Sequence, residues 1–75
     1  MASGMDRTAL EERLAGIDAK IAGVAQQIDE QRQAIERLES AGQPADHAKY
    51  LLAGLELLHK AYRAGRDAML AEAQE

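Results

Sequence analysis

Hydrophobic residues recur at alternating spacings of three and four along two long segments, which are separated by Gly42-Gln43-Pro44. This spacing puts the hydrophobic side chains on one helix face and keeps that face against a partner helix over its whole length. The pattern predicts an all-α fold: an antiparallel, coiled-coil-like hairpin of two helices. In the first segment the stripe consists of Leu10, Leu14, Ile17, Ile21, Val24, Ile28, Gln31, Ile35 and Leu38. In the second it consists of Ala48, Leu51, Leu55, Leu58, Tyr62, Gly65 and Met69.

Local signals mark where each helix begins and ends. Thr8 and Glu11 have the spacing of a capping box, which predicts the start of the first helix near Asp6 or Thr8. Gly42 can adopt the left-handed conformation that ends a helix, and Pro44 suits the first turn of the next one. The predicted boundaries are a helix over residues 6–41, a turn at 42–43 and a helix over 44–73, in a single domain of residues 6–75.

A connection this short makes the two helices antiparallel neighbours, so the stripes predict a register. In that register a large side chain faces a small one at Leu38/Ala48, Val24/Tyr62 and Ile21/Gly65, which is the alternation that close packing favours. The predicted facing pairs are Leu38 with Ala48, Ile35 with Leu51, Gln31 with Leu55, Ile28 with Leu58, Val24 with Tyr62, Ile21 with Gly65, Ile17 with Met69 and Leu14 with Glu72.

Two helices alone leave one side of each hydrophobic face in water, and a chain of 75 residues builds only a small core. Cysteine is absent, which excludes disulfides and thiolate metal sites as a source of stability. We therefore expect a homodimer in which two hairpins form a four-helix bundle. The interface candidates are Leu14, Ile17, Ile21, Val24, Ile28, Gln31, Ile35, Leu51, Leu52, Leu55, Leu58, Tyr62 and Met69.

Two features of the first helix leave alternatives open. Gly16 and Gly23, one heptad apart, form a strip of small residues that is either a tolerated surface or a second contact strip for another helix. Gln31 interrupts the stripe, and it either fixes register and partner number or reaches the rim or its mate in the dimer.

The spacing Glu56-x-x-His59 is that of the ligands in di-iron four-helix bundles, so these two residues are the metal candidates. However, the stripe assigns the core positions to Leu55 and Leu58, which turns Glu56 outward and puts His59 on the flank. Pairing of Glu56 with Lys60 is the simpler interpretation. We expect no metal and no cofactor.

A short basic cluster on the second helix raises the alternative of RNA binding. Acidic neighbours dilute the cluster, and a net charge of −4 argues against a nucleic-acid partner. Arg63 and Asp67 are expected to form an exposed ion pair. The cluster consists of His59, Lys60, Arg63 and Arg66, and its acidic neighbours are Glu56, Asp67 and Glu72.

No residues in the sequence have the pattern of a catalytic triad or a nucleotide-binding loop, so we expect a protein that is not an enzyme. No apolar run approaches the roughly 20 residues that span a bilayer, and no secretion signal is seen, which predicts a cytoplasmic protein without membrane contact. Residues 1–5 are expected to be a disordered tail or a remnant of an expression tag ahead of Met5.

The segments Gln31–Glu39 and Ala48–Leu52, with Gly42 between them, resemble small uncharacterised bacterial helical-hairpin proteins. In architecture the chain is similar to the Rop-type RNA-binding hairpin dimer, although no motif supports carrying over its RNA-contacting positions. The expected function is a non-enzymatic, self-associating hairpin that serves as a protein-interaction or scaffold module, with itself as the first partner. The alternatives are a small RNA-binding regulator and, third, a metal-binding helical bundle.

Overall fold

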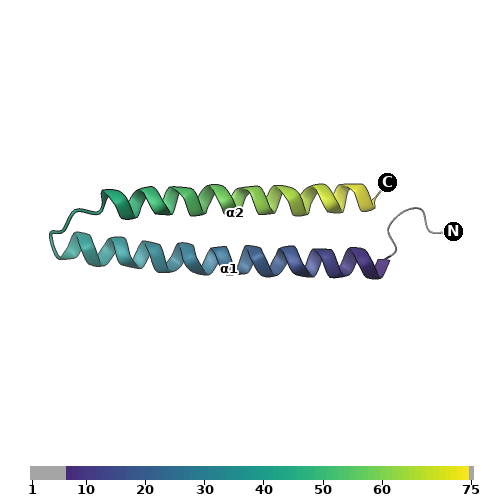
Figure 1. The fold of residues 1–75 in the computed structure, drawn as a ribbon, viewed down its shortest axis with the longest axis horizontal. Coiled ribbons are helices and arrows are strands. Elements are labelled where there is room, and N and C mark those ends of the chain that lie inside the picture. Colours follow the sequence, from purple (N-terminus) through teal and green to yellow (C-terminus); the bar gives the residue numbers. More distant parts are fainter. Residues whose placement is uncertain (1–6, 75) are drawn as a thin grey trace.

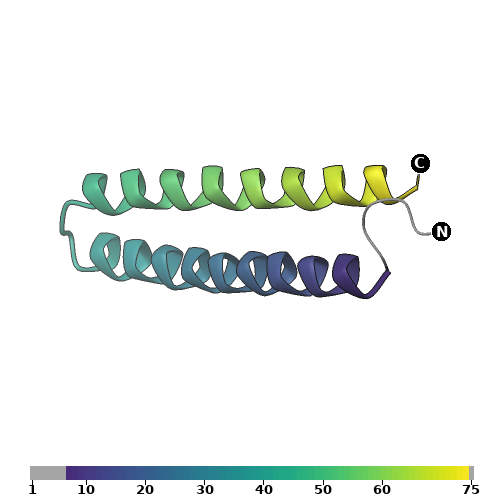
Figure 2. The ribbon, with the colours of Figure 1, turned by 45° about the vertical axis from the view of Figure 1, so that its right-hand side comes forward.

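The computed structural model describes residues 7–74, which form two long helices lying side by side (Figure 1). Helix α1 spans Arg7–Ser40 and helix α2 spans Asp46–Ala73. The helices are antiparallel, so the start of α1 and the end of α2 lie at the same end of the hairpin, and the second view shows the same arrangement (Figure 2). The described residues contain no strand. The predicted all-α helical hairpin is confirmed.

The end of α1 is closed by hydrogen bonds that depend on Gly42. This residue has a φ of 70°, in the left-handed region that side chains with a Cβ disfavour. The backbone N–H of Gln43 donates to the carbonyl of Leu38 at 2.8 Å, and that of Gly42 donates to the carbonyl of Glu39 at 3.0 Å. These two bonds form a Schellman motif, which satisfies carbonyls that the helix end would otherwise leave unpaired.

The connection between the helices is longer than the predicted turn at 42–43. Pro44 lies before α2 rather than in its first turn, and Ala45 is the N-cap residue, without a side-chain capping bond. Ala45 is buried, so packing holds this position although it lacks a capping side chain. Asp46 is the first residue of α2, where its carboxylate complements the positive end of the helix dipole.

At the other end, α1 already includes Arg7, so Thr8 lies inside the helix and not at its N-cap. The carboxylate of Glu11, which the capping box would direct to the backbone, instead lies 3.7 Å from the guanidinium of Arg7. The alternative start at Asp6 falls outside the described residues, as does the predicted tail 1–5.

The buried core of the hairpin is small. Val24, Ile28 and Ile35 of α1 and Ala45 before α2 are its buried hydrophobic residues within the described chain. None of the residues of α2 is buried. Each helix therefore packs along one narrow face, and the sides of the hairpin stay open.

The structure corrects the predicted contact face of α2. The half-buried positions include Leu52 and His59, whereas Leu51 and Leu58 are 45% and 40% exposed. The predicted stripe and the observed face share Gly65 and a framework of four half-buried residues spaced one heptad apart. The framework consists of Ala48, Leu55, Tyr62 and Met69.

The predicted pairs Ile35/Leu51 and Ile28/Leu58 therefore do not form the centre of the contact between the helices. At the predicted pair Ile21/Gly65 the neighbour on α1 is a different residue, because a Cβ added at Gly65 would lie 3.5 Å from Cδ1 of Ile17, with no atom of Ile21 as close. The prediction used hydrophobicity alone and therefore placed leucines in the contact rather than a histidine. A histidine can nevertheless pack the body of its ring on apolar surface and keep its polar tip in water.

Candidate interaction surfaces

Ion pairs between the helices gather on one side of the hairpin, which we call the charged flank. A carboxylate oxygen of Glu56 lies 3.1 Å from a guanidinium nitrogen of Arg32, and Nζ of Lys49 lies 2.9 Å from a carboxylate oxygen of Glu39. All four side chains are about half exposed, so each pair contributes little stability but helps fix the register. The pair with Arg32 replaces the predicted pair of Glu56 with Lys60.

The hydrogen bond from Lys49 to Glu39, together with the negative charge of Glu39, raises the pKa of the Lys49 ammonium above its usual 10.5. This pair sits beside the turn, where it joins the last turn of α1 to the first turn of α2.

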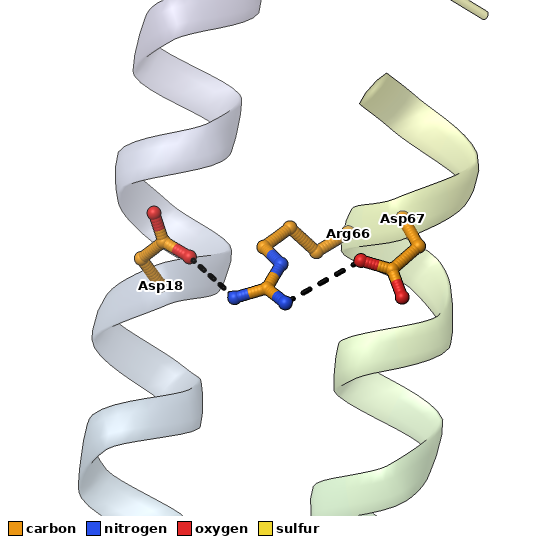
Figure 3. Close-up of polar contacts among 3 residues, drawn as sticks. All are labelled: Asp18, Arg66 and Asp67. Atoms are coloured by element: carbon orange, nitrogen blue, oxygen red, sulfur yellow. Dashed lines mark hydrogen bonds and ion pairs between the residues drawn. The ribbon is translucent and has the colours of Figure 1, made fainter. Parts of the chain in front are cut away.

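Arg66 reaches across from α2 towards α1 (Figure 3). One of its terminal nitrogens lies 3.7 Å from Asp18, and the other lies 3.4 Å from Asp67. Its Nε is buried and has no hydrogen-bond partner. Asp67 therefore pairs with Arg66 and not, as the sequence predicted, with Arg63.

A shallow groove runs along the charged flank between the two helices. It contains every charged residue of the predicted basic cluster except Arg66, and it also contains the metal candidates Glu56 and His59. Three basic and three acidic side chains line it, so the groove has no net charge: Arg32, Lys60 and Arg63 face Asp29, Glu56 and Asp67.

The groove lacks the ligands of a metal site. Within residues 7–74 there is no group of three histidine, cysteine, aspartate or glutamate side chains that could hold a metal ion. Glu56 is engaged by Arg32, and His59 is a half-buried residue between the helices. The arrangement of Glu56 and His59 is therefore explained by packing and one ion pair.

Gln31 connects the two helices of one hairpin. Its side-chain nitrogen donates a hydrogen bond to the carbonyl of Ala48 at 3.0 Å. Gln31 is half-buried, and its bond ties the last third of α1 to the first turn of α2. This bond supports a role in register within the hairpin; whether Gln31 also sets the number of partners stays a prediction.

Hydrophobic side chains gather on the side of α2 opposite the charged flank, which we call the apolar flank. Four large side chains lie there, with exposed fractions of 75% for Tyr50, 70% for Leu57, 45% for Leu51 and 40% for Leu58. Their positions follow from the 100° that a helix turns per residue, counted from the half-buried face. Leu70, which is also 40% exposed, lies on the charged side of the half-buried face of α2 and not on the apolar flank.

Small residues continue the apolar flank towards the end of α2. At alternating spacings of three and four the flank contains Leu51, Gly54, Leu58, Ala61, Gly65 and Ala68, with no charged residue among them. The spacing of this second stripe is as regular as that of the first. Its glycines and alanines are less hydrophobic than leucine, so its hydrophobic pattern is weaker. It was missed because one stripe was assigned to α2 where two lie side by side.

On α1, the apolar flank includes Gly16 and Lys20, which border a hollow together with Tyr62 and Met69 of α2. The ammonium of Lys20 lies 6.0 Å from the centre of the Tyr62 ring. No atom beyond its own helix backbone and chain neighbours would lie within 4 Å of a Cβ added at Gly16 or Gly23. The predicted second contact strip is thus unoccupied by the hairpin itself.

Neither helix of the described chain has a stretch long and apolar enough to cross a membrane. Comparison with protein-family models, with curated proteins and with solved structures found no match. The function must therefore be argued from the two flanks.

Proposed function

We propose that the chain is a non-enzymatic, self-associating helical hairpin that acts as a protein-interaction or scaffold module in the cytoplasm. The observation that supports this proposal most strongly is the imbalance between core and surface. Within residues 7–74, a core of four buried hydrophobic residues is accompanied by five large hydrophobic side chains that are at least 40% exposed, all of them on α2.

The imbalance favours association because exposed apolar surface contributes stability only when it is removed from water. Contiguous apolar surface of this kind typically marks an interaction site in a small protein. A second copy is always available to the chain, and two hairpins can complete one core as a four-helix bundle.

The test is one purification of the full chain in which solution mass, absorbance and metal content are measured on the same sample. We expect light scattering to give twice the chain mass of 8.1 kDa at micromolar concentration, a 260/280 nm ratio typical of protein alone, and no stoichiometric metal. A stable monomer at these concentrations would contradict the proposal.

The same sample tests the two alternatives. Co-purifying nucleic acid would favour the RNA-binding regulator, and stoichiometric iron would favour the metal-binding bundle. The balanced charges of the groove on the charged flank give the RNA-binding regulator no specific support, because phosphate binding needs an excess of basic side chains.

A further inference from the structure

We propose that two copies of the hairpin pack through their apolar flanks, with α2 running antiparallel to α2 of the partner and α1 antiparallel to α1 of the partner. The inference rests on the proposed self-association and adds the surface and the orientation. Both follow from the order of residues along the two helices.

The apolar flank of α2 is complementary to the same flank of a second copy that runs in the opposite direction. The reversal is centred midway between His59 and Lys60, and it sets each large residue of the stripe against a small one. Leu51 meets the partner's Ala68, and Leu58 meets the partner's Ala61. Gly54 meets the partner's Gly65, which lets the two backbones approach closely.

A parallel pair in register lacks this fit. It sets Leu51 and Leu58 each against the same leucine of the partner, whereas the other layers of the stripe pair only glycine with glycine or alanine with alanine. Dense packing is served best by large side chains opposite small ones, and the antiparallel arrangement sets each leucine of the stripe opposite an alanine.

The ends of the α2 stripe also fit the antiparallel arrangement. His47 and Glu72 continue the stripe at the same spacing, and the reversal places them opposite each other. An imidazole N–H can donate to a carboxylate, whereas the parallel arrangement sets two carboxylates of Glu72 together.

On α1 the apolar flank gives the same result independently. Its positions at alternating spacings of three and four are centred on the height of Ala25, and they are Gly16, Lys20, Gly23, Gln27, Glu30 and Ala34. Reversal pairs Lys20 with the partner's Glu30, which have opposite charges, and Gly16 with the partner's Ala34, both small. It also pairs Gly23 with the partner's Gln27, so the open surface over Gly23 receives a side chain.

The two centres lie at the same height along the hairpin. The ion pairs Asp18–Arg66 and Arg32–Glu56 join the helices on either side of these centres, and midway between them lie Ala25 on α1 and Ala61 on α2, within two residues of the centre on α2. One twofold axis perpendicular to the helices can therefore relate both pairs at once, as a closed dimer requires.

Because the chain has no cysteine, single cysteines can test this orientation. Ala61→Cys and Ala68→Cys are a matched pair, since both positions are exposed, lie on the same stripe and are one heptad apart. In the antiparallel dimer the introduced cysteine and its copy in the partner are separated along the helix axis. At 1.5 Å of rise per residue this separation is about 5 Å for Ala61→Cys and about 25 Å for Ala68→Cys. Each variant is equilibrated with reduced and oxidised glutathione and separated on a non-reducing gel, after circular dichroism has shown that it is helical.

We expect a disulfide-linked dimer from Ala61→Cys and a chain that stays monomeric on the gel from Ala68→Cys. Linked dimers from both variants would overturn the inference in favour of a parallel pair, and a linked dimer from Ala68→Cys alone would overturn it as well. If neither variant links while wild-type chain sediments as a dimer, the hairpins pair through another face and only this inference fails. If neither variant links and wild-type chain sediments as a monomer, the proposed self-association fails too.

Discussion

Leu58 and Leu70 form a matched pair that separates dimerisation from folding of the hairpin. Both are leucines of α2 with the same exposed fraction of 40%, but Leu58 lies on the apolar flank and Leu70 lies on the other side. Substitution by glutamine keeps nearly the same helix propensity, so the change acts mainly through burial. Leu58→Gln and Leu70→Gln should therefore destabilise a single hairpin to a similar extent.

The effect on the dimer can be estimated from the surface that remains exposed. Full burial of a leucine side chain is worth roughly 2 kcal/mol, so covering the 40% that is exposed is worth about 0.8 kcal/mol. In a symmetric dimer the residue occurs twice, which gives about 1.6 kcal/mol and roughly a 15-fold increase in Kd for Leu58→Gln.

Sedimentation equilibrium at several concentrations measures the Kd, and circular dichroism measures helix content and thermal stability. Leu70→Gln should leave the Kd within about twofold of the wild-type value, because its side chain contacts no partner. An equal rise in Kd for both variants would refute the assignment of the interface to the apolar flank, and so would an unchanged Kd for Leu58→Gln.

Three further predictions concern the hairpin itself. Gly42→Ala should lower the free energy of unfolding by about 1–2 kcal/mol, measured by urea titration, because alanine is strained at a φ of 70°; an unchanged value would mean that the turn rearranges freely. Gln31→Leu should raise thermal stability by about 1 kcal/mol, since burial of the leucine outweighs one hydrogen bond and the carbonyl of Ala48 can still accept its helical bond; a loss of stability would show that the bond to Ala48 dominates. The raised pKa of Lys49 means that its pairing with Glu39 stabilises the hairpin below pH 10.5 and that this stabilisation is lost as the pH rises through the raised value. The melting temperatures of wild-type chain and Lys49→Gln should therefore converge in strong alkali, and a constant difference across that range would contradict the prediction.

The hairpin could be predicted from sequence because its signals are local. The alternating spacing gives two helices, and Gly42 gives a helix end that the structure confirms with a left-handed residue and a Schellman motif. The stripe of α1 was placed well, since Val24, Ile28 and Ile35 are the buried residues of that helix.

The face of α2 could not be predicted with the same success. Two hydrophobic stripes lie side by side on this helix, and choosing between them depends on contacts with α1 that residue types do not specify. Leu51 and Leu58 were assigned to the contact between the helices, whereas His59 and Arg66 lie closer to it. Arginine packs an apolar stem and histidine the body of its ring, and both keep a polar end for water. The same limit affected the ion pairs, because Arg32 and Asp18 come near their partners only through the register of the two helices.

The central claim is that one hairpin is completed by another, and the concentration dependence of unfolding tests it most directly. If folding and dimerisation are coupled, a 100-fold increase in chain concentration stabilises the folded state by about 2.7 kcal/mol of dimer. The midpoint of urea unfolding should then rise by about 1 M for a dimer of this size. Midpoints that coincide over the whole concentration range would show that the single hairpin is the complete folded unit.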